Sequence, residues 1–467
     1  MRLKQVALVF GMISLSMPLL LPPPDGMPDE AWLASGLAFV MALWWLTEAL
    51  PLAATALLPL AVAPLLGIGT ITDVAAHYSN PLVVLFLGGF LLAKSIERSE
   101  LHRRLAFTIL GLAGKSPGRV LAAMMVTTAF LSLWISNTAS AMVVAPVAGA
   151  IAGSQQDHAR FGTALMLGVA FSATIGGMGS LIGTPPNAIF AAYVSTTYGM
   201  EVGFAQWAMV GLPVALILLV ATWLVLARLT PGIRSEELTT SFGGDLAEMD
   251  TGERRVAMVA GLTALAWISR PLLEWLLPGI MLTDAGIAMI AAVALFLIPA
   301  GNRERLLDWE AAATLRWDVL ILFGGGLALA GILDQTGLAA WIGTRMEAFQ
   351  ELPTLALILV IASLIVFLGE LASNTAMAAI FLPIAGAAAT ALDTDPISFV
   401  LPVAIAASVG FMLPVATPPN AIVFSDPAVS RAAMLRAGVP LDLIGILVAV
   451  GVGLLLGPQV FGEFTVR

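Results

Sequence analysis

The chain has 467 residues, of which 59% are hydrophobic and 11% charged, and its formal net charge is −9. Soluble globular domains carry roughly 45–50% apolar and about 25% charged residues, so this composition excludes an ordinary water-soluble domain. The sequence contains no cysteine, which excludes disulfides, thiolate chemistry and zinc–cysteine sites. His77, His102 and His158 have no ligand-like spacing, so no metal centre built on histidine is expected.

Apolar runs long enough to cross a hydrocarbon layer, which takes about 20 residues as a helix, recur along the whole chain. The first run, residues 5–21, follows Arg2 and Lys4 as a secretory signal would. It ends in Pro22-Pro23-Pro24-Asp25 without a small-residue cleavage site, which favours a retained first helix. Further helices are predicted at 31–50, 52–68, 81–98 and 207–229, with an amphipathic piece at 100–115, a divided stretch at 118–153 and a broken helix at 162–200.

Residues 230–254 form the one polar segment, which is predicted to be a cytoplasmic linker. After it come helices at 255–277, 283–299, 317–334 and 437–457, an amphipathic piece at 337–349, a divided stretch at 352–391 and a broken helix at 397–427. The sequence thus predicts an all-α polytopic membrane protein with about 11 transmembrane helices. Its predicted parts are an N-terminal helix (1–30), a first repeat (31–229), a second repeat (255–457) and a tail (458–467).

The basic residues test the orientation of these spans, because cytoplasmic loops carry an excess of Lys and Arg. We place the N-terminus in the cytoplasm and let each divided stretch enter and leave on one side of the membrane. Of the 21 basic residues, all but Arg270, Arg345 and Arg467 then fall on the cytoplasmic side. The bias favours two re-entrant hairpins, at 118–153 and 352–391, in a multi-pass protein of the inner (plasma) membrane whose C-terminus is external.

Two halves of the chain share motifs at a constant spacing. Residues 86–101 (FLGGFLLAKSIERSEL) resemble residues 323–338 (FGGGLALAGILDQTGL), 237 positions later, and the same offset carries Ser136-Asn137-Thr138 onto Ser373-Asn374-Thr375. With four residues fewer, Gly183-Thr184-Pro185-Pro186-Asn187 falls on Ala416-Thr417-Pro418-Pro419-Asn420. Each copy has five spans, an odd number, so the second copy is predicted to be inverted, as in many secondary transporters.

Ser-Asn-Thr interrupts both divided stretches with polar side chains at membrane depth. Irregular backbone is tolerated there only inside protein or beside a water-filled cavity. Carbonyls that end one hairpin arm can bind a cation, and the N–H groups that begin the next arm can bind an anion. An Asn side chain offers an oxygen to a cation and N–H groups to a carboxylate. Both motifs are also good helix N-caps, but their equivalent positions favour a binding site.

Thr-Pro-Pro-Asn breaks a helix, because two prolines remove two backbone donors and force the preceding residue out of the α region. The carbonyls of Gly183 and Ala416 then lack helical partners and can coordinate sodium, while the hydroxyls of Thr184 and Thr417 can reach a substrate. Residues 120–156, 161–200, 371–392 and 397–425 contain no Asp, Glu, Lys, Arg or His. A multiply charged anion would need helix dipoles and bound cations here, which favours Na⁺ coupling over a proton relay.

Two acids lie close to these motifs. Glu48 ends the run WWLTE at residues 44–48, and we interpret it as an interfacial, structural residue. Glu370 lies three residues before Ser373. Its role is open between bracing the second hairpin and tuning a cation site.

The chain closely resembles the divalent-anion:sodium symporter family of INDY-like carriers of dicarboxylates, citrate and, in some members, sulfate. The resemblance covers nearly the whole chain and includes WWLTEALPL at 44–52, both Ser-Asn-Thr motifs and ASVGFMLPVATPPNAIV at 407–423. It implies a homodimer in which a transport domain moves against a scaffold domain like an elevator. It also implies Na⁺ as the coupling ion, no organic cofactor, no enzymatic activity and no nucleic-acid partner.

The resemblance further implies the site residues. One Na⁺ site would use Ser132, Ser136, Asn137 and the Gly183 carbonyl, and a second would use Ser373, Asn374 and the Ala416 carbonyl. The substrate carboxylates would meet Asn137, Thr138, Thr184, Asn374, Thr375 and Thr417. This sequence departs from a symmetric pair of sites at Gly369, which stands where the first copy has Ser132.

Three functions are compatible with this pattern. Na⁺-coupled uptake of C4-dicarboxylates such as succinate, malate and fumarate is favoured by the chargeless site and the paired motifs. A Na⁺-independent exchanger of dicarboxylates or citrate is an alternative, favoured by Gly369 alone, and sulfate is an alternative cargo. An ion channel or receptor fits two hairpins less well. The sequence does not rank the possible anions.

Overall fold

The structure is a computed structural model that describes residues 2–153, 159–229, 248–276, 279, 281–301, 304–346 and 351–462. Within these ranges the fold is all-helical, apart from one isolated antiparallel bridge between Pro299 and Arg305. Eight helical segments are long and apolar enough to cross a membrane, and seven shorter helices are also apolar, counting only the described residues. The predicted all-α polytopic architecture is therefore confirmed.

The first half begins with helices that mostly match the prediction. They are α1 (Arg2–Leu20), α2 (Asp29–Thr47), α3 (Leu52–Thr55), α4 (Leu58–Leu66), α5 (Ile71–Tyr78), α6 (Pro81–Arg98) and α7 (Leu101–Gly111). The single helix predicted at 52–68 is wrong: it is divided into α3 and α4 at residues 56–57, since Pro59, in the first turn of α4, has no N–H to donate to the Thr55 carbonyl that ends α3. Helix α5 was not predicted, and it begins where the Thr70 side chain accepts the Asp73 N–H.

The rest of the first half contains the divided and broken elements. They are α8 (Pro117–Ser132), α9 (Asn137–Gly153), α10 (Ala159–Met178), α11 (Pro185–Tyr198) and α12 (Phe204–Leu229). Helices α8 and α9 form the first hairpin around residues 133–136, and α10 and α11 form a helix broken at residues 179–184. Both features were predicted, and they are confirmed. The Ser-Asn-Thr motif marks the start of α9 and Pro185 that of α11, which suits a residue without an N–H.

The second half repeats this order. Its helices are α13 (Thr251–Leu276), α14 (Asp284–Leu297), α15 (Trp309–Ala313), α16 (Trp317–Gln335), α17 (Leu338–Met346), α18 (Thr354–Gly369), α19 (Asn374–Ala391), α20 (Ile397–Ala406), α21 (Pro418–Phe424) and α22 (Arg431–Phe461). The second hairpin, α18–α19, turns at residues 370–373, and the second broken helix, α20–α21, is open over residues 407–417. These two predictions are also confirmed.

Helix boundaries in the second half follow those of the first. Helix α8 becomes α18 at the 237-residue offset at both ends, α9 and α19 begin at equivalent residues, and α6 and α16 end at equivalent residues. Two helices of the second half extend beyond their predicted bounds. Helix α13 already begins at Thr251, inside the predicted linker, and residues 230–247 of that linker lie outside the described residues. Helix α22 extends over 431–461, because the Ser430 side chain caps its start before the arginines. It thus includes the first residues of the predicted tail, whose residues 463–467 lie outside the description.

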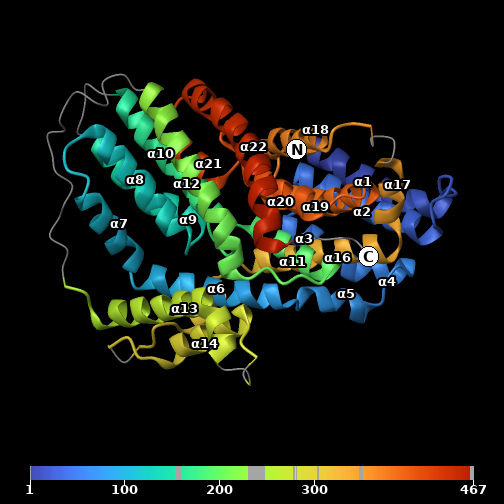
Figure 1. Cartoon of the computed structure of the whole chain (residues 1–467), viewed down its shortest axis with the longest axis horizontal. Coiled ribbons are helices and arrows are strands. Elements are labelled where there is room, and N and C mark those ends of the chain that lie inside the picture. The colour runs from blue at the N-terminus through green and yellow to red at the C-terminus, as the bar shows by residue number, and fades with distance from the viewer. Residues whose placement is uncertain are drawn as a thin grey trace.

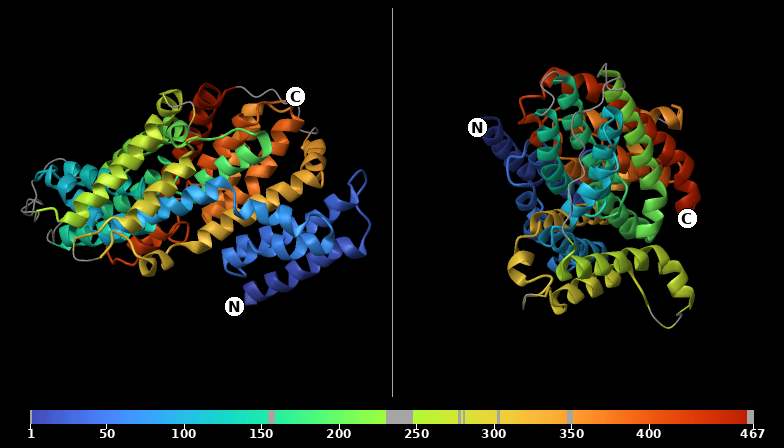
Figure 2. Two further views of the ribbon diagram at one scale, coloured as in Figure 1. Left: turned by 90° about the horizontal axis from the view of Figure 1, so that it is seen from below. Right: turned by 90° about the vertical axis from the view of Figure 1, so that its left-hand side faces the viewer.

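The two halves interlock in space. Figure 1 shows α8, α9, α10 and α12 on one side, α1, α2 and α17 on the other, and α6 running beneath them. The second arm of each broken helix packs against the hairpin of the opposite half: α11 lies against α19, and α21 lies against α9. Figure 2 shows α1 at one end of the molecule and α13 with α14 as an outer layer. Each broken helix is therefore packed in part by the hairpin of the other half.

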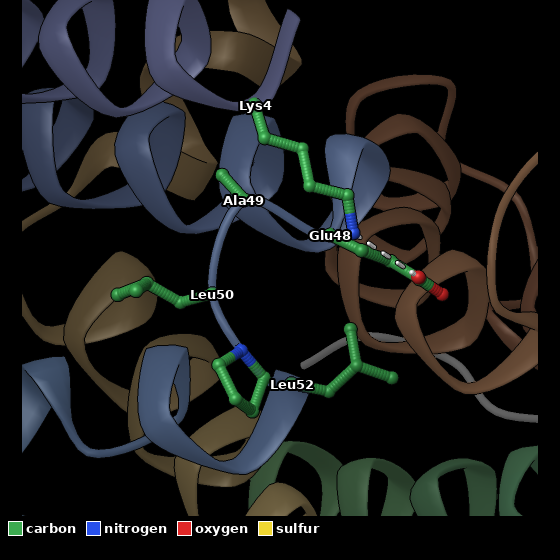
Figure 3. A pocket seen from close by; sticks show the side chains of 6 residues that line it. Lys4, Glu48, Ala49, Leu50 and Leu52 are labelled. Carbon is green, nitrogen blue, oxygen red and sulfur yellow. Dashed lines mark ion pairs between the residues drawn. The ribbon is translucent and has the colours of Figure 1, made fainter. Parts of the chain in front are cut away.

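Glu48 lies at the exposed end of the N-terminal pair α1–α2. Glu48 follows α2 with a positive φ of 46°, its side chain is 59% exposed, and its Oε2 lies 3.9 Å from Lys4 Nζ. These two residues line an open pocket of about 420 Å³ together with residues 49–52 (Figure 3). An exposed ion pair of this length stabilises a fold little, so this position offers a surface contact rather than a part of the hairpin sites.

Candidate functional site

The first hairpin tip gathers oxygen atoms from three elements. Ser132 Oγ, at the end of α8, lies 2.6 Å from Asn137 Oδ1 at the start of α9 and 2.6 Å from the Ala173 carbonyl of α10. A hydroxyl has one proton, so it can donate to only one of these acceptors. The other contact brings two oxygen atoms together without a hydrogen. A bound cation, or an Asn137 amide turned to present its nitrogen, would relieve this contact.

Glycines let the broken helix approach this hairpin tip. A Cβ on Gly177 would overlap the Asn137 amide, and a Cβ on Gly183 would lie 2.5 Å from the Gly177 carbonyl and 2.9 Å from the Ser132 carbonyl. Backbone carbonyls of both elements therefore face the same small space. The structure thus brings together Ser132, Asn137 and Gly183, as the sequence predicted. Ser136 is exposed, and its Oγ accepts the Ala139 N–H at 3.2 Å, which is the ordinary capping role.

The second hairpin tip is more open. Asn374 Oδ1 is buried and has no hydrogen-bond partner among the described residues. A Cβ on Gly410 would lie 3.8 Å from Asn374 Oδ1 and 3.4 Å from the Ala416 Cβ, so these three residues share one space. A Cβ added to Gly369 would lie 4.0 Å from the same oxygen. The hydroxyl that Ser132 supplies to Asn137 therefore has no counterpart beside Asn374, and Ser373 forms no side-chain cap within the described ranges.

The threonines of the two Thr-Pro-Pro-Asn motifs behave differently. Both are N-cap residues in extended conformation and both are 5% exposed. Thr417 Oγ1 accepts the Asn420 N–H at 3.4 Å, whereas Thr184 forms no such cap in the described structure. Thr138 and Thr375 lie in the first turns of α9 and α19, half-buried and buried respectively. Of the two threonine hydroxyls, only that of Thr417 is thus used to cap its helix in the described structure.

The sequence alone predicts no role for the asparagines that end these motifs. Asn187 Nδ2 donates to the carbonyls of Gly177 at 3.0 Å and Ser180 at 2.8 Å. Asn420 Nδ2 donates to the carbonyls of Gly410 at 3.1 Å and Leu413 at 3.0 Å, which are the equivalent positions. Each asparagine therefore closes its broken-helix loop by satisfying carbonyls that the helix break frees. Their position within the repeated motif was the available signal.

Replacing Asn187 with alanine is expected to lower the free energy of unfolding by about 2 kcal/mol, because buried carbonyls lose their donor. Asn187→Asp should be at least as damaging, since a carboxylate cannot donate to a carbonyl. Unfolding of the purified protein in mixed micelles measures the change. Asn80→Ala is the control: the Asn80 side chain accepts the Leu82 N–H at the start of α6, and such a cap contributes only about 1 kcal/mol. A fully stable Asn187→Ala protein would contradict the closing role.

Each hairpin tip is tied to the broken helix of its own half. Ser180 Oγ donates to the Leu133 carbonyl at 2.6 Å in the first half. In the second half, Glu370 accepts the N–H groups of Met412 at 2.8 Å and Leu413 at 2.6 Å. Leu133 and Glu370 are equivalent positions, as are Ser180 and Leu413. Bracing of the second hairpin, one of the two roles open for Glu370, is therefore its observed contact.

A family model described as the sodium:sulfate symporter transmembrane region matches residues 3–462. A sodium-dependent dicarboxylate transporter SdcS of Staphylococcus saprophyticus is 38% identical over 480 residues, covering 98% of this chain and 92% of the relative. The protein of the same name from Staphylococcus aureus strain RF122 is 37% identical with the same coverage.

Solved structures share the fold at low sequence identity. The YdaH transporter of Alcanivorax borkumensis matches with a TM-score of 0.62 and 14% identity, covering 94% of this chain and 100% of that chain. MtrF of Neisseria gonorrhoeae matches with a TM-score of 0.57 and 15% identity, covering 94% and 96%. At these identities the likeness concerns the arrangement of helices alone.

Proposed function

Because this chain belongs to the sodium:sulfate symporter family and is a membrane transporter rather than an enzyme, we propose that it couples Na⁺ influx to the uptake of di- and tricarboxylates. C4-dicarboxylates such as succinate, malate and fumarate are the proposed cargo. Two amide oxygens carry the proposal: Asn137 Oδ1 lies against Ser132 Oγ, which has a second acceptor, and Asn374 Oδ1 has no hydrogen-bond partner among the described residues. Such oxygens are suitable ligands for a sodium ion.

The proposed cation sites lie at the two hairpin tips. The first uses Ser132, Ser136, Asn137 and the Gly183 carbonyl, and the crowded oxygens around Ser132 Oγ support it. The second uses Ser373, Asn374 and the Ala416 carbonyl, and the buried, unpartnered Asn374 Oδ1 supports it. Because Ser136 already caps α9, it is the weakest member of the first set.

The proposed anion site lies between the two tips. The N-termini of α9 and α19 present N–H groups and positive dipole charge, which favour an anion. The Asn137 and Asn374 amides and the hydroxyls of Thr138, Thr184, Thr375 and Thr417 complete the proposed set. Bound Na⁺ would supply the positive charge that the nearby side chains lack.

We further propose that the two repeats have inverted topology and that the hairpin domain moves as an elevator within a homodimer. The matching helix boundaries at the 237-residue offset support the repeat. The basic-residue bias supports inversion, a cytoplasmic N-terminus and a location in the inner membrane. The reciprocal packing of α11 on α19 and of α21 on α9 supports one moving unit.

Purified protein in liposomes tests the proposal. Labelled succinate is expected to accumulate inside substrate-free vesicles only when an inward Na⁺ gradient is imposed, and unlabelled malate, fumarate, citrate and sulfate should rank as competitors. Uptake that is indifferent to Na⁺ but requires an internal counter-substrate would instead support exchange. Gly369 is the observation that favours this second candidate, since it leaves Asn374 Oδ1 without the hydroxyl found in the first half.

A further inference from the structure

Two buried acids hold three consecutive backbone N–H groups of the second broken helix. Asp442 Oδ1 accepts the Phe411 N–H at 3.0 Å, and Glu370 accepts those of Met412 at 2.8 Å and Leu413 at 2.6 Å. Asp442 is 0% exposed and Glu370 is 1% exposed. The three bonds therefore join the hairpin α18–α19, the loop 407–417 and α22. Figure 1 shows α22 beside α18 and α20, the helices that carry these segments.

The remaining oxygen of this cluster has no donor. Asp442 Oδ2 is buried and lacks a hydrogen-bond partner among the described residues. The Glu370 carboxyl lies beside the Asp442 side chain, because the two accept N–H groups of the consecutive residues Phe411 and Met412. Two ionised carboxylates in such contact repel one another, and burial strengthens the repulsion. Carboxyl groups in this arrangement share a proton.

No basic side chain on the surrounding described helices lies close enough to neutralise the two buried carboxyl groups. On the helices around the pair, α10, α12, α18, α19, α20 and α22, the only other ionisable groups outside tyrosine are Arg160, Arg228, Arg431 and Arg436. All four are exposed. Arg436, the nearest along α22, is six residues from Asp442, about 9 Å along the helix axis. Among these groups, Glu370 is the one that binds the backbone next to that bound by Asp442.

A metal cation fits this cluster poorly. Three of the four carboxylate oxygens already accept a backbone N–H, whose positive end points at the oxygen. A sodium ion needs several free oxygens, whereas a proton needs only Asp442 Oδ2 and its Glu370 neighbour. The observations therefore favour a proton as the occupant.

The described residues of the first half contain no such pair at the equivalent positions. Leu133 occupies the position of Glu370. Gly211 in α12 and Gly438 in α22 pack against equivalent residues of the two broken helices, Met178 and Phe411. Four residues after these glycines stand Ala215 and Asp442, so Ala215 is the first-half equivalent of Asp442. Acids thus occupy these two positions in the second half only, although Ser180 ties the first half without any charge. A purely structural brace does not require two carboxyls.

We propose that Glu370 and Asp442 form a proton-binding site, in which a proton on Asp442 Oδ2 is donated to the Glu370 carboxylate. The shared proton joins the second hairpin, the loop 407–417 and α22 into one unit. That loop also carries Gly410 and Ala416, which lie beside Asn374. Loss of the proton would leave two contacting negative charges and release the loop beside the second hairpin tip.

Matched variants test the proton without any transport measurement. Asp442→Asn keeps the acceptor for Phe411 and replaces the shared proton with an amide hydrogen that does not titrate. Asp442→Leu removes both. Glu370→Gln loses one of the two acceptors for Met412 and Leu413, so it should destabilise the protein, whereas Asp442→Asn should not. Exposed Glu48→Gln is the control. Unfolding of the full chain in mixed micelles, followed against pH, provides the readout.

The wild-type protein should lose stability relative to Asp442→Asn as the pH rises. Over the pH range in which the native state keeps a proton that the unfolded chain has already lost, the unfolding constant rises about tenfold per pH unit, and this rise ends once the native site has titrated. Infrared spectra at neutral pH should contain a protonated carboxyl band in wild type and Glu48→Gln that Asp442→Asn lacks. Parallel pH curves with no lost band would overturn the proposal. So would a weakened Na⁺ stabilisation in Asp442→Asn with an unchanged pH curve, which would indicate a cation site. Neither readout depends on which anion is carried.

Discussion

Replacing Asn374 with alanine is expected to reduce Na⁺-driven uptake strongly, by raising the Na⁺ concentration it requires, while changing the free energy of unfolding by no more than about 0.5 kcal/mol. The Asn374 amide oxygen is buried and has no hydrogen-bond partner among the residues that the structure describes. Removing it therefore breaks no bond of the protein itself. If the oxygen binds Na⁺, loss of a contact to a charged ligand weakens binding by about 1.5–3 kcal/mol, or roughly 10-fold to 100-fold. Initial uptake rates across a Na⁺ series measure this loss.

Asn137→Ala is the matched variant in the first half. Asn137 Oδ1 lies 2.6 Å from Ser132 Oγ, so this replacement removes an internal contact as well as a proposed ligand. It should lower both uptake and stability, whereas Asn374→Ala lowers uptake alone. If Asn374→Ala keeps the Na⁺ dependence and rate of the wild type, the second proposed cation site is wrong.

Replacing Gly183 with alanine is expected to reduce uptake at least as severely, through packing. The added Cβ would lie 2.5 Å from the Gly177 carbonyl and 2.9 Å from the Ser132 carbonyl, and both are backbone atoms that cannot rotate away. Overpacking of this kind costs about 1–3 kcal/mol and displaces the backbone. It would shift the proposed Na⁺ ligands Ser132 and Gly183 together. Uptake rates and thermal unfolding, measured on the same preparation, report the two effects.

The second half supplies the reciprocal test, because Ala416 occupies the equivalent position. The break there spans residues 407–417, against 179–184 in the first half, which leaves room for the methyl group. Ala416→Gly should cost only about 1 kcal/mol, the value of one buried methyl. Gly451→Ala in α22 is a neutral control, since nothing lies within 4 Å of its added Cβ. An active, stable Gly183→Ala protein would contradict the close approach at the first tip.

Much of the fold followed from sequence because its signals are local. The start of α6 at Pro81 and the turns at Ser-Asn-Thr are set by residues that cap or break helices wherever they occur. The repeat then doubled each observation. Short helices α5 and α15 escaped prediction, because a few residues capped by Thr70 or Asp308 produce no apolar run. The division of α3 from α4 was missed because both sides are apolar.

The site was only partly predictable, since its contacts join distant segments. The pairing of Ser132 with Asn137 spans five residues and fits a hairpin tip. The contact of Glu370 with Leu413 spans 43 residues, and Asp442 reaches Phe411 from another helix. Asp442 was the one acid within an apolar span at 437–457, a signal that deserved weight because charge is costly in a membrane. Which backbone it meets could not be read from spacing.

The reciprocal packing of the broken helices also constrains how the chain is made. Helix α11 ends at Tyr198, but α19, against which it packs, begins at Asn374, 176 residues later. At about 5–20 residues per second, a ribosome needs roughly 10–35 s to synthesise that interval. During this time the nascent first half sits in the bilayer with the α19-facing side of α11 uncovered. The two halves therefore reach their final form together, late in synthesis, although one is translated well before the other.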